Sequence, residues 1–220
     1  MNWLSDAVGL LAKGGVVMIP LLTCSVISVA VLFERNARVK KAREDAADVV
    51  MKAEDEMYSG NADRAAKLLE SHESAVAHVL AAGIRASHLG DRAVERAMEE
   101  QGTREVGALT CRLSWLDTII TIAPLLGLLG TVTGMISAFH VIATKQGIST
   151  PTAITGGVAE ALIATATGLA IAIVTLIGHN ALQERIKGIV TEIEARSNAM
   201  LNVITDASED KRREIKSLSA

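Results

Sequence analysis

The 220-residue sequence has little aromatic character and almost no cysteine. Phe, Trp and Tyr together make up 2% of the residues, although half of the residues are hydrophobic. The apolar stretches are instead rich in Ala and Gly, the small residues that let helices pack closely in lipid. Cys24 and Cys111 lie in different environments, one apolar and one polar, so we predict no disulfide between them. Neither has the spacing of a metal ligand.

The sequence also lacks the signatures of several functional classes. It contains no His-Glu-x-x-His motif, no Gly-x-Ser-x-Gly motif, and no aspartate within an apolar stretch, which argues against an intramembrane hydrolase. A net charge of −3 gives no basic footprint for nucleic acid. The histidines His72, His78 and His88 are scattered and form no metal motif. We therefore expect no enzymatic activity, no catalytic residues, no metal, no cofactor and no nucleic-acid partner.

Three apolar stretches are long enough to cross a membrane as helices, which takes about 20 residues each. Within the second, His140 is the only titratable residue, and within the third, Glu160 is the only charge. We predict an all-α membrane protein with the following segments: an N-terminal segment at 1–13, membrane helices at 14–33, 118–143 and 152–178, a loop at 144–151, and polar helical extensions at 34–117 and 179–220.

The distribution of basic residues predicts the orientation in the membrane. Five basic residues follow the first apolar stretch closely, whereas the loop 144–151 contains only Lys145. By the positive-inside rule, 34–117 is then cytoplasmic, the N-terminus and the loop are periplasmic, and the C-terminal extension is cytoplasmic. The first apolar stretch lacks a basic segment before it and a clear cleavage site, so we expect a retained anchor.

Composition and spacing predict that the polar segments are helical. Residues 36–57 are good helix formers without Pro or Gly, and 58–61 should break that helix. Further helices are expected over 62–71 and 74–88. From Arg92 we expect one helix that runs directly into the second membrane stretch, and after the third stretch a helix up to about Ile204, with 208–220 frayed.

Glu160 is the most informative residue in the sequence. A bare charge in hydrocarbon costs about 2.5–3.5 kcal/mol even on lenient scales, so the side chain should face a bundle interior or a water-filled path. An alternative is a structural ion pair with a basic residue of a partner.

Two runs of residues resemble the MotA/TolQ/ExbB proton-channel family, most closely its ExbB/TolQ branch. After Pro124 the second stretch contains Gly127-Leu128-Leu129-Gly130-Thr131-Val132-Thr133-Gly134, and the third contains Ala159-Glu160-Ala161-Leu162-Ile163-Ala164-Thr165-Ala166-Thr167-Gly168-Leu169. Glu34-Arg35 after the first stretch, the chain length and the three-span layout are also similar to that branch.

The resemblance implies an inner-membrane subunit that assembles as a homopentameric ring around a dimer of an ExbD/TolR-like single-span partner. The partner would carry the aspartate that takes up and releases the proton. The complex would convert proton-motive force into work on the cell envelope, through a TonB-like or Pal-linked client, in outer-membrane import or envelope maintenance.

Carried over residue by residue, the resemblance places Thr131, Glu160 and Thr165 on the ion pathway. Threonine hydroxyls both donate and accept hydrogen bonds, so they can support a short water chain. Thr133, Thr167 and Pro124 are candidates for either the pathway or packing. The small residues of both runs should be packing notches rather than ion ligands: Gly127, Gly130, Gly134, Gly157, Ala161, Ala164 and Gly168.

Two alternatives stay open on the sequence alone. The chain can be a non-conducting scaffold that anchors its partner, or a stator for another motility or envelope system. Protons are expected as the coupling ion rather than sodium, because a sodium site needs several converging oxygen ligands and the threonines are dispersed.

Overall fold

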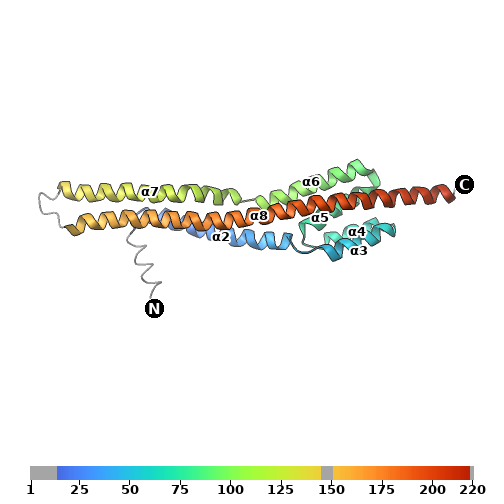
Figure 1. The fold of residues 1–220 in the computed structure, drawn as a ribbon, viewed down its shortest axis with the longest axis horizontal. Helices are drawn as coiled ribbons and strands as arrows, with labels where there is room; N and C mark the ends of the chain where they lie inside the picture. The colour runs from blue at the N-terminus through green and yellow to red at the C-terminus, as the bar shows by residue number, and fades with distance from the viewer. Residues whose placement is uncertain (1–13, 145–150, 219–220) are drawn as a thin grey trace, which may run out of the picture. The chain divides into compact units, whose positions relative to one another are not determined.

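The computed structural model describes residues 14–144 and 151–218, all of whose regular secondary structure is helical. The predicted segment 1–13, nearly all of the loop 144–151 and the last two residues lie outside these ranges. The helices are α2 (Met18–Ala42), α3 (Ala47–Tyr58), α4 (Ala62–Glu70), α5 (Ala75–Ala86), the 3₁₀ helix η1 (Ser87–Leu89), α6 (Asp91–Thr110), α7 (Leu113–Thr144) and α8 (Pro151–Leu218) (Figure 1). The all-α prediction is confirmed.

Contacts divide the chain into two compact units. One comprises Met1–Glu34 and Arg112–Ala181 and is called the membrane unit below; the other comprises Arg35–Cys111 and Leu182–Ala220 and is called the polar unit. The helices α2 and α8 contribute residues to both units.

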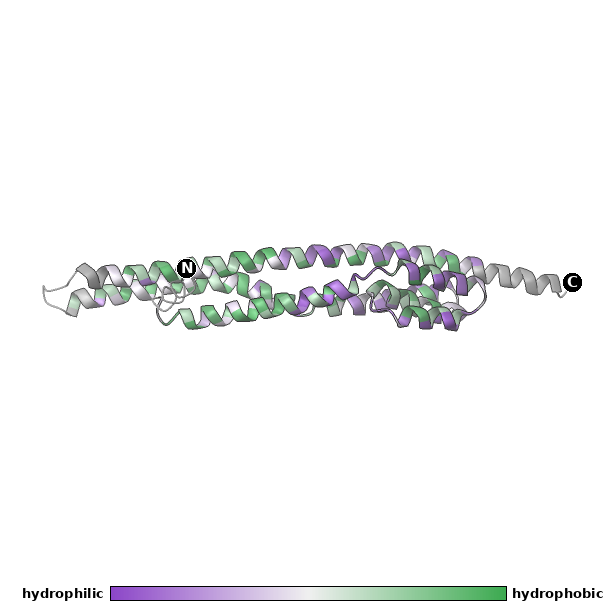
Figure 2. Cartoon of the chain, turned by 90° about the horizontal axis from the view of Figure 1, so that it is seen from below, coloured by the Kyte–Doolittle hydropathy of each residue, from purple (hydrophilic) through white to green (hydrophobic). Residues whose placement is uncertain are grey.

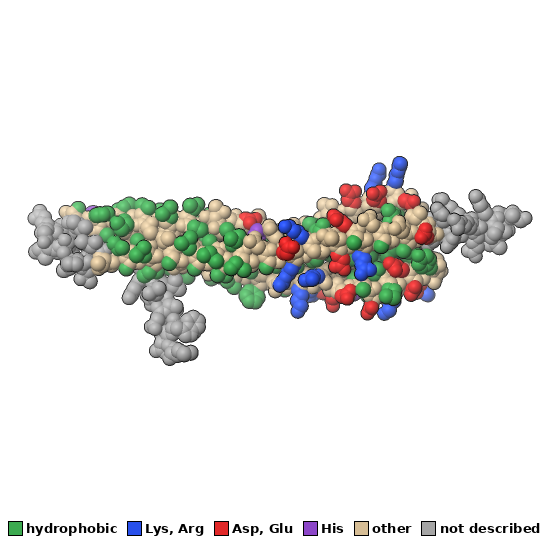
Figure 3. Space-filling model, viewed as in Figure 1, with side chains coloured by type: hydrophobic (Ala, Val, Ile, Leu, Met, Phe, Trp, Pro, Cys, Tyr) green, Lys and Arg blue, Asp and Glu red, His purple; other side chains and the backbone are tan. Residues whose placement is uncertain are grey.

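Three helices are long and apolar enough to cross a membrane, as predicted, and the apolar windows fall in α2, α7 and α8. Only 22%, 28% and 28% of the residues in these windows are buried. Large apolar side chains of the membrane unit are therefore exposed, among them Leu125, Phe139 and Leu162. Hydropathy colouring shows the apolar character of these segments (Figure 2). In Figure 3, patches of hydrophobic side chains lie on the visible face of the half of the chain that contains α7, and charged side chains gather on the other half. Lipid or other protein chains have to cover such a surface.

In the membrane unit, α7 and α8 pack antiparallel through small residues. A Cβ atom at Gly168 would lie 2.4 Å from the carbonyl oxygen of Ala123, and one at Gly134 would lie 2.9 Å from that of Gly157. A Cβ atom at Gly127 of α7 would lie 3.0 Å from the Cα atom of Thr165 in α8. The backbones approach this closely only because side chains are absent there, which confirms the predicted packing notches.

The helix α2 packs on this pair through larger apolar residues. Met18 and Leu21 of α2 form one buried cluster with Ile119 and Ala123 of α7 and Ala172 of α8. The cluster fixes the start of α2 against the middle of the pair, which positions the polar groups described below.

In the polar unit, α3, α4 and α5 pack in succession around buried residues such as Leu69, Leu80 and Ile84. Arg85 of α5 forms a two-pronged ion pair with Glu70 of α4. The Arg85 guanidinium lowers the pKa of the Glu70 carboxyl below its ordinary value, so the pair stabilises the unit at neutral pH and is lost as the pH falls through that lowered pKa.

Two of the predicted helix boundaries are wrong. The predicted helix 36–57 is interrupted, because α2 ends at Ala42 and α3 begins at Ala47. The Asp45 carboxylate accepts a hydrogen bond from the Ala47 backbone N–H at 2.9 Å. A side chain that accepts a hydrogen bond from a nearby backbone N–H replaces the bond that would continue the helix, so the first helix ends and a new one begins.

The predicted continuous helix from Arg92 into the second membrane stretch is also interrupted, since α6 ends at Thr110 and α7 begins at Leu113. Arg112 between them has a φ of +65°, a left-handed conformation that is unfavourable for a side chain with a Cβ atom. Its guanidinium forms an ion pair with Glu34 at 2.7 Å, which helps to hold the turn. At the other end of the chain, α8 continues to Leu218, beyond the predicted end near Ile204.

The close contact at Gly168 predicts a measurable effect of one methyl group. Gly168→Ala should destabilise the membrane unit by about 1–3 kcal/mol, because a Cβ atom would clash with the Ala123 carbonyl. A matched control is Gly188→Ala in the same helix, where no atom lies within 4 Å of the added Cβ. The control should gain about 0.5–1 kcal/mol from helix propensity. Thermal unfolding midpoints in detergent measure both, and equal midpoints for the two variants would contradict the packing argument.

Candidate functional site

Thr165 is the predicted pathway residue that joins two membrane helices. Its hydroxyl donates a hydrogen bond to the backbone carbonyl of Gly127 at 2.9 Å, from α8 to α7. This bond is possible because Gly127 has no side chain to separate the helices. The side chain is half-buried. Thr165 therefore lies against the second membrane helix, α7.

Thr131 lies on α7 about one turn beyond Gly127. Its hydroxyl donates to the carbonyl of Leu128 on the same helix at 2.6 Å. A hydroxyl that donates to its own helix still has lone pairs that accept hydrogen bonds from water or from a protonated carboxyl. Thr131 therefore provides a polar oxygen about one turn along α7 from the Gly127 carbonyl to which Thr165 donates.

The remaining threonine candidates bond to their own helices. Thr133 donates to the carbonyl of Leu129 at 3.0 Å, and Thr167 donates to that of Ile163 at 2.8 Å. This is the usual role of threonine in membrane helices. Pro124 lies inside α7 and has no N–H to donate to the preceding turn, so one carbonyl of that turn lacks its helical donor.

Glu160 lies against the start of α2. A Cβ atom at Gly15 would lie 1.8 Å from Glu160 Oε1, so only glycine leaves room for this carboxylate. Gly15 also has a φ of +73°, which favours glycine. Helix α2 begins three residues after Gly15, where the Met18 N–H donates to the Gly15 carbonyl at 3.1 Å. The positive end of a helix dipole stabilises a nearby anion.

Glu160 and Thr165 do not share a face of α8. Five residues separate them, which corresponds to about 140° around the helix axis. Thr165 accordingly faces α7 and Glu160 faces the start of α2. Glu160 is half-buried and forms no ion pair with another described residue. A structural ion pair within the described residues therefore does not explain why a charged residue occupies this position.

A second set of polar residues in the membrane unit was missed in the sequence. Ser28 of α2 and Thr175 of α8 are 2% and 1% exposed, and their hydroxyl oxygens lie 2.6 Å apart. One turn further along α8, His179 is also buried, and its Nε2 lies 3.3 Å from the Asp117 carboxylate of α7. Ser28, Thr175 and His179 are all the buried polar side chains in the described part of the membrane unit.

A signal for this set was present in the sequence. The buried positions of α8 recur at spacings of three and four residues: Ala161, Ala164, Gly168, Ala172, Thr175, His179, Leu182, Ile186, Ile189 and Ile193. Thr175 and His179 thus continue the small-residue stripe, and a polar residue on such a stripe has to find a partner on a facing helix.

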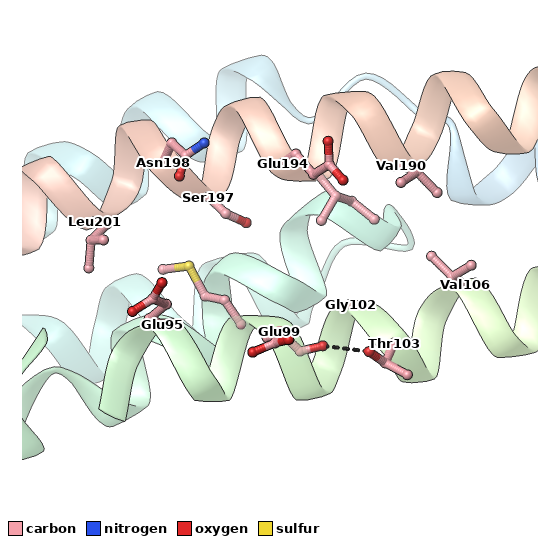
Figure 4. Close-up of a pocket in the computed structure, with 12 residues that line it drawn as sticks. Glu95, Glu99, Gly102, Thr103, Val106, Val190, Glu194, Ser197, Asn198 and Leu201 are labelled. Atoms are coloured by element: carbon pink, nitrogen blue, oxygen red, sulfur yellow. Dashed lines mark hydrogen bonds between the residues drawn. The ribbon is translucent and has the colours of Figure 1, made fainter. Parts of the chain in front are cut away.

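The polar unit has a groove between α6 and α8 with a volume of about 540 Å³ (Figure 4). Three glutamates, Glu95, Glu99 and Glu194, lie along it, and Figure 4 shows Val106 and Val190 at one end. Among the residues that the structure describes, no cluster of His, Cys, Asp or Glu could hold a metal ion.

Comparison with known proteins identifies relatives over most of the chain. Residues 71–195 match the MotA/TolQ/ExbB proton channel family. A protein of Synechocystis sp. that carries the name ExbB-like 1 is 34% identical over 172 residues, which are 75% of this chain and 66% of the relative. The Tol-Pal system protein TolQ of Haemophilus influenzae is 31% identical over 190 residues, 79% of this chain and 80% of the relative. The biopolymer transport protein ExbB of Helicobacter pylori is 46% identical over 74 residues, 34% of this chain and 50% of the relative.

The buried hydroxyl pair makes a testable prediction. Thr175→Val leaves the Ser28 hydroxyl without this partner and should lower the free energy of unfolding by about 1 kcal/mol. Ser28→Ala should have a similar effect, and the double variant should lose less than the sum of the two. Thr191→Val is the control, because Thr191 is exposed and bonds only to the carbonyl of Lys187. Unfolding titrations in mixed detergent measure the coupling; strictly additive losses would show that the two hydroxyls do not interact.

Proposed function

Because the chain belongs to the MotA/TolQ/ExbB proton channel family, in its ExbB/TolQ branch, we propose that it is the channel subunit of a proton-driven motor in the bacterial inner membrane. In this proposal five copies form a ring around the membrane helices of two copies of an ExbD/TolR-like partner. Proton-motive force then drives work on the cell envelope through a TonB-like or Pal-linked client. The N-terminus is periplasmic, and the C-terminal part of α8 is cytoplasmic.

The observation that carries the proposal is the bond from Thr165 to the Gly127 carbonyl. It places a hydroxyl oxygen within the contact between the two helices that contain the family's two runs. Thr131 adds a second oxygen about one turn away. Both hydroxyls can still accept a hydrogen bond, so a protonated carboxyl of the partner or a water molecule can donate to them.

Glu160 has an electrostatic role in this proposal. Its carboxylate lies beside Gly15, just before α2 begins, and on a different face of α8 from Thr165. A negative charge at that position raises the local concentration of protons and favours a cation on the path. Polar groups on two faces of one helix suit a helix that contacts both the ring interior and its own neighbours.

A non-conducting scaffold is the competing function, and a specific observation favours it. The hydroxyls of Thr131, Thr133 and Thr167 all point to carbonyls of their own helices, as in helices that only pack. Ion flux distinguishes the two functions, because both predict the same assembly and the same partner.

Charge and hydroxyl removal should separate conduction from assembly. Glu160→Gln, Thr131→Val and Thr165→Val should each assemble with the partner, because each substitution nearly keeps the side-chain volume. Proton flux into liposomes should fall about tenfold or more, equivalent to about 1.4 kcal/mol in the barrier. Native mass spectrometry of the complex and flux measurements on the same preparation provide both readouts.

Matched controls on α8 are Glu184→Gln and Thr191→Val, which change exposed residues of the polar unit. Both should conduct as the unmodified complex does. Full flux in all three pathway variants would refute the channel role of these residues. Loss of assembly in Glu160→Gln alone would assign that residue to a structural ion pair, and an assembly of a different size would refute the pentamer.

The coupling ion is a further prediction. The hydroxyls of Thr131, Thr165 and Thr167 donate to three separate carbonyls, so these three residues do not form an oxygen cage for sodium. Flux at a fixed proton-motive force should be the same when a large organic cation replaces sodium. A rate that follows external sodium would overturn proton coupling.

A further inference from the structure

The polar unit contains a basic pocket where α2 ends. It has a volume of about 670 Å³ and is formed by residues of α2, of the turn after it, and of α8. Four of the seven lining residues are basic and one is acidic: Ala37, Val39, Lys40, Lys41, Arg43, Glu44 and Arg185. At neutral pH the lining therefore carries a net charge of about +3.

The basic side chains of the pocket differ in how they are held. Lys41 forms an ion pair with Glu73 at 2.9 Å, and this carboxylate raises the pKa of the Lys41 ammonium. The Arg185 guanidinium donates to the Asn36 side-chain oxygen at 2.5 Å, which fixes it and leaves further N–H groups for a ligand. Lys40 and Arg43 are exposed and form no side-chain hydrogen bond or ion pair with any residue of the described ranges.

The position of the pocket along the helices is informative. Lys40 follows Phe33, the last residue of the first apolar stretch, by seven residues, and Arg185 follows Gly178, the last of the third, by the same number. Along a continuous helix this is about 10 Å. Lipid headgroups extend about 5–8 Å beyond the hydrocarbon, and long basic side chains reach back toward them.

The lining also favours a lipid over a small anion. A single phosphate ion would fill little of the 670 Å³. The exposed Ala37 provides apolar surface beside the cations, which suits the glycerol part of a phospholipid rather than a fully hydrated ion. Guanidinium and ammonium groups bind the phosphate oxygens themselves.

We propose that this pocket binds the phosphate headgroup of an anionic phospholipid from the adjacent leaflet, with Lys40, Arg43 and Arg185 as its ligands. The three cations favour a lipid with two phosphates over a lipid with one. Binding ties the point where α2 ends to α8 at the membrane surface. The proposal rests on the membrane location given under Proposed function, but it is independent of proton conduction.

The test measures lipid binding to the purified full-length assembly in neutral detergent. Native mass spectrometry follows titration with cardiolipin, phosphatidylglycerol and phosphatidylcholine. Cardiolipin should bind more tightly than phosphatidylglycerol, and phosphatidylcholine should bind weakly. The triple variant Lys40→Gln, Arg43→Gln, Arg185→Gln should bind cardiolipin about 100-fold more weakly, at about fivefold per basic residue. The control Lys52→Gln, Arg92→Gln, Arg96→Gln removes the same charge from exposed positions outside the pocket and should bind as the unmodified chain does.

Four results would overturn the proposal: equal binding of phosphatidylcholine, undiminished cardiolipin binding by the triple variant, an equal loss in the control, and displacement of the lipid by millimolar inorganic phosphate. The last would identify a site for a free anion. If the triple variant does not assemble, Lys40→Gln and Arg43→Gln are measured singly, since neither side chain bonds to a residue in 14–144 or 151–218. Each should then weaken binding about fivefold. Proton flux plays no part in this measurement, so a non-conducting protein could still confirm the lipid site.

Discussion

At Gly168 the backbones of α7 and α8 come so close that a methyl group would lie 2.4 Å from the Ala123 carbonyl oxygen. This contact sets the spacing of the two helices over several turns, and the Gly127 and Gly134 contacts extend it. Lipid tails are as apolar as the side chains, so the hydrophobic effect does not drive helices together within a bilayer, and close van der Waals contact has to do so. The Thr165 hydroxyl reaches the Gly127 carbonyl only because of this spacing.

Charged groups at the boundary between the two units have separate partners on each side. Within the membrane unit Glu34 pairs with Arg112, and within the polar unit Arg35 donates to the Ala108 carbonyl. Adjacent residues at the end of one apolar stretch therefore stabilise different units. The helices α2 and α8 each contribute residues to both units.

The polar groups of the membrane unit fall into two sets with different environments. Thr131, Thr165 and Glu160 are half-buried, and the two hydroxyls retain the capacity to accept hydrogen bonds. Ser28 and Thr175 are fully buried and satisfy each other. The first set suits a surface that another chain completes, and the second suits a permanent link between helices of one subunit.

Much of this protein was predictable from the sequence. The three apolar stretches, the all-helical fold, the family and the packing role of the glycines follow from local composition and from motifs that are contiguous in the chain. The break at residues 58–61 was also predictable, since Gly60 there adopts a φ of +79°.

The tertiary structure alone decided which distant residues meet. At the break before α7, Arg112 pairs with Glu34, which lies 78 residues away in the sequence. The pairing of Ser28 with Thr175, of His179 with Asp117, and of Glu160 with the space at Gly15 likewise joins segments far apart in sequence. The spacing of apolar residues identifies which face of a helix is buried. It does not predict which residues of two helices lie opposite each other, because that register is fixed only when their side chains pack together.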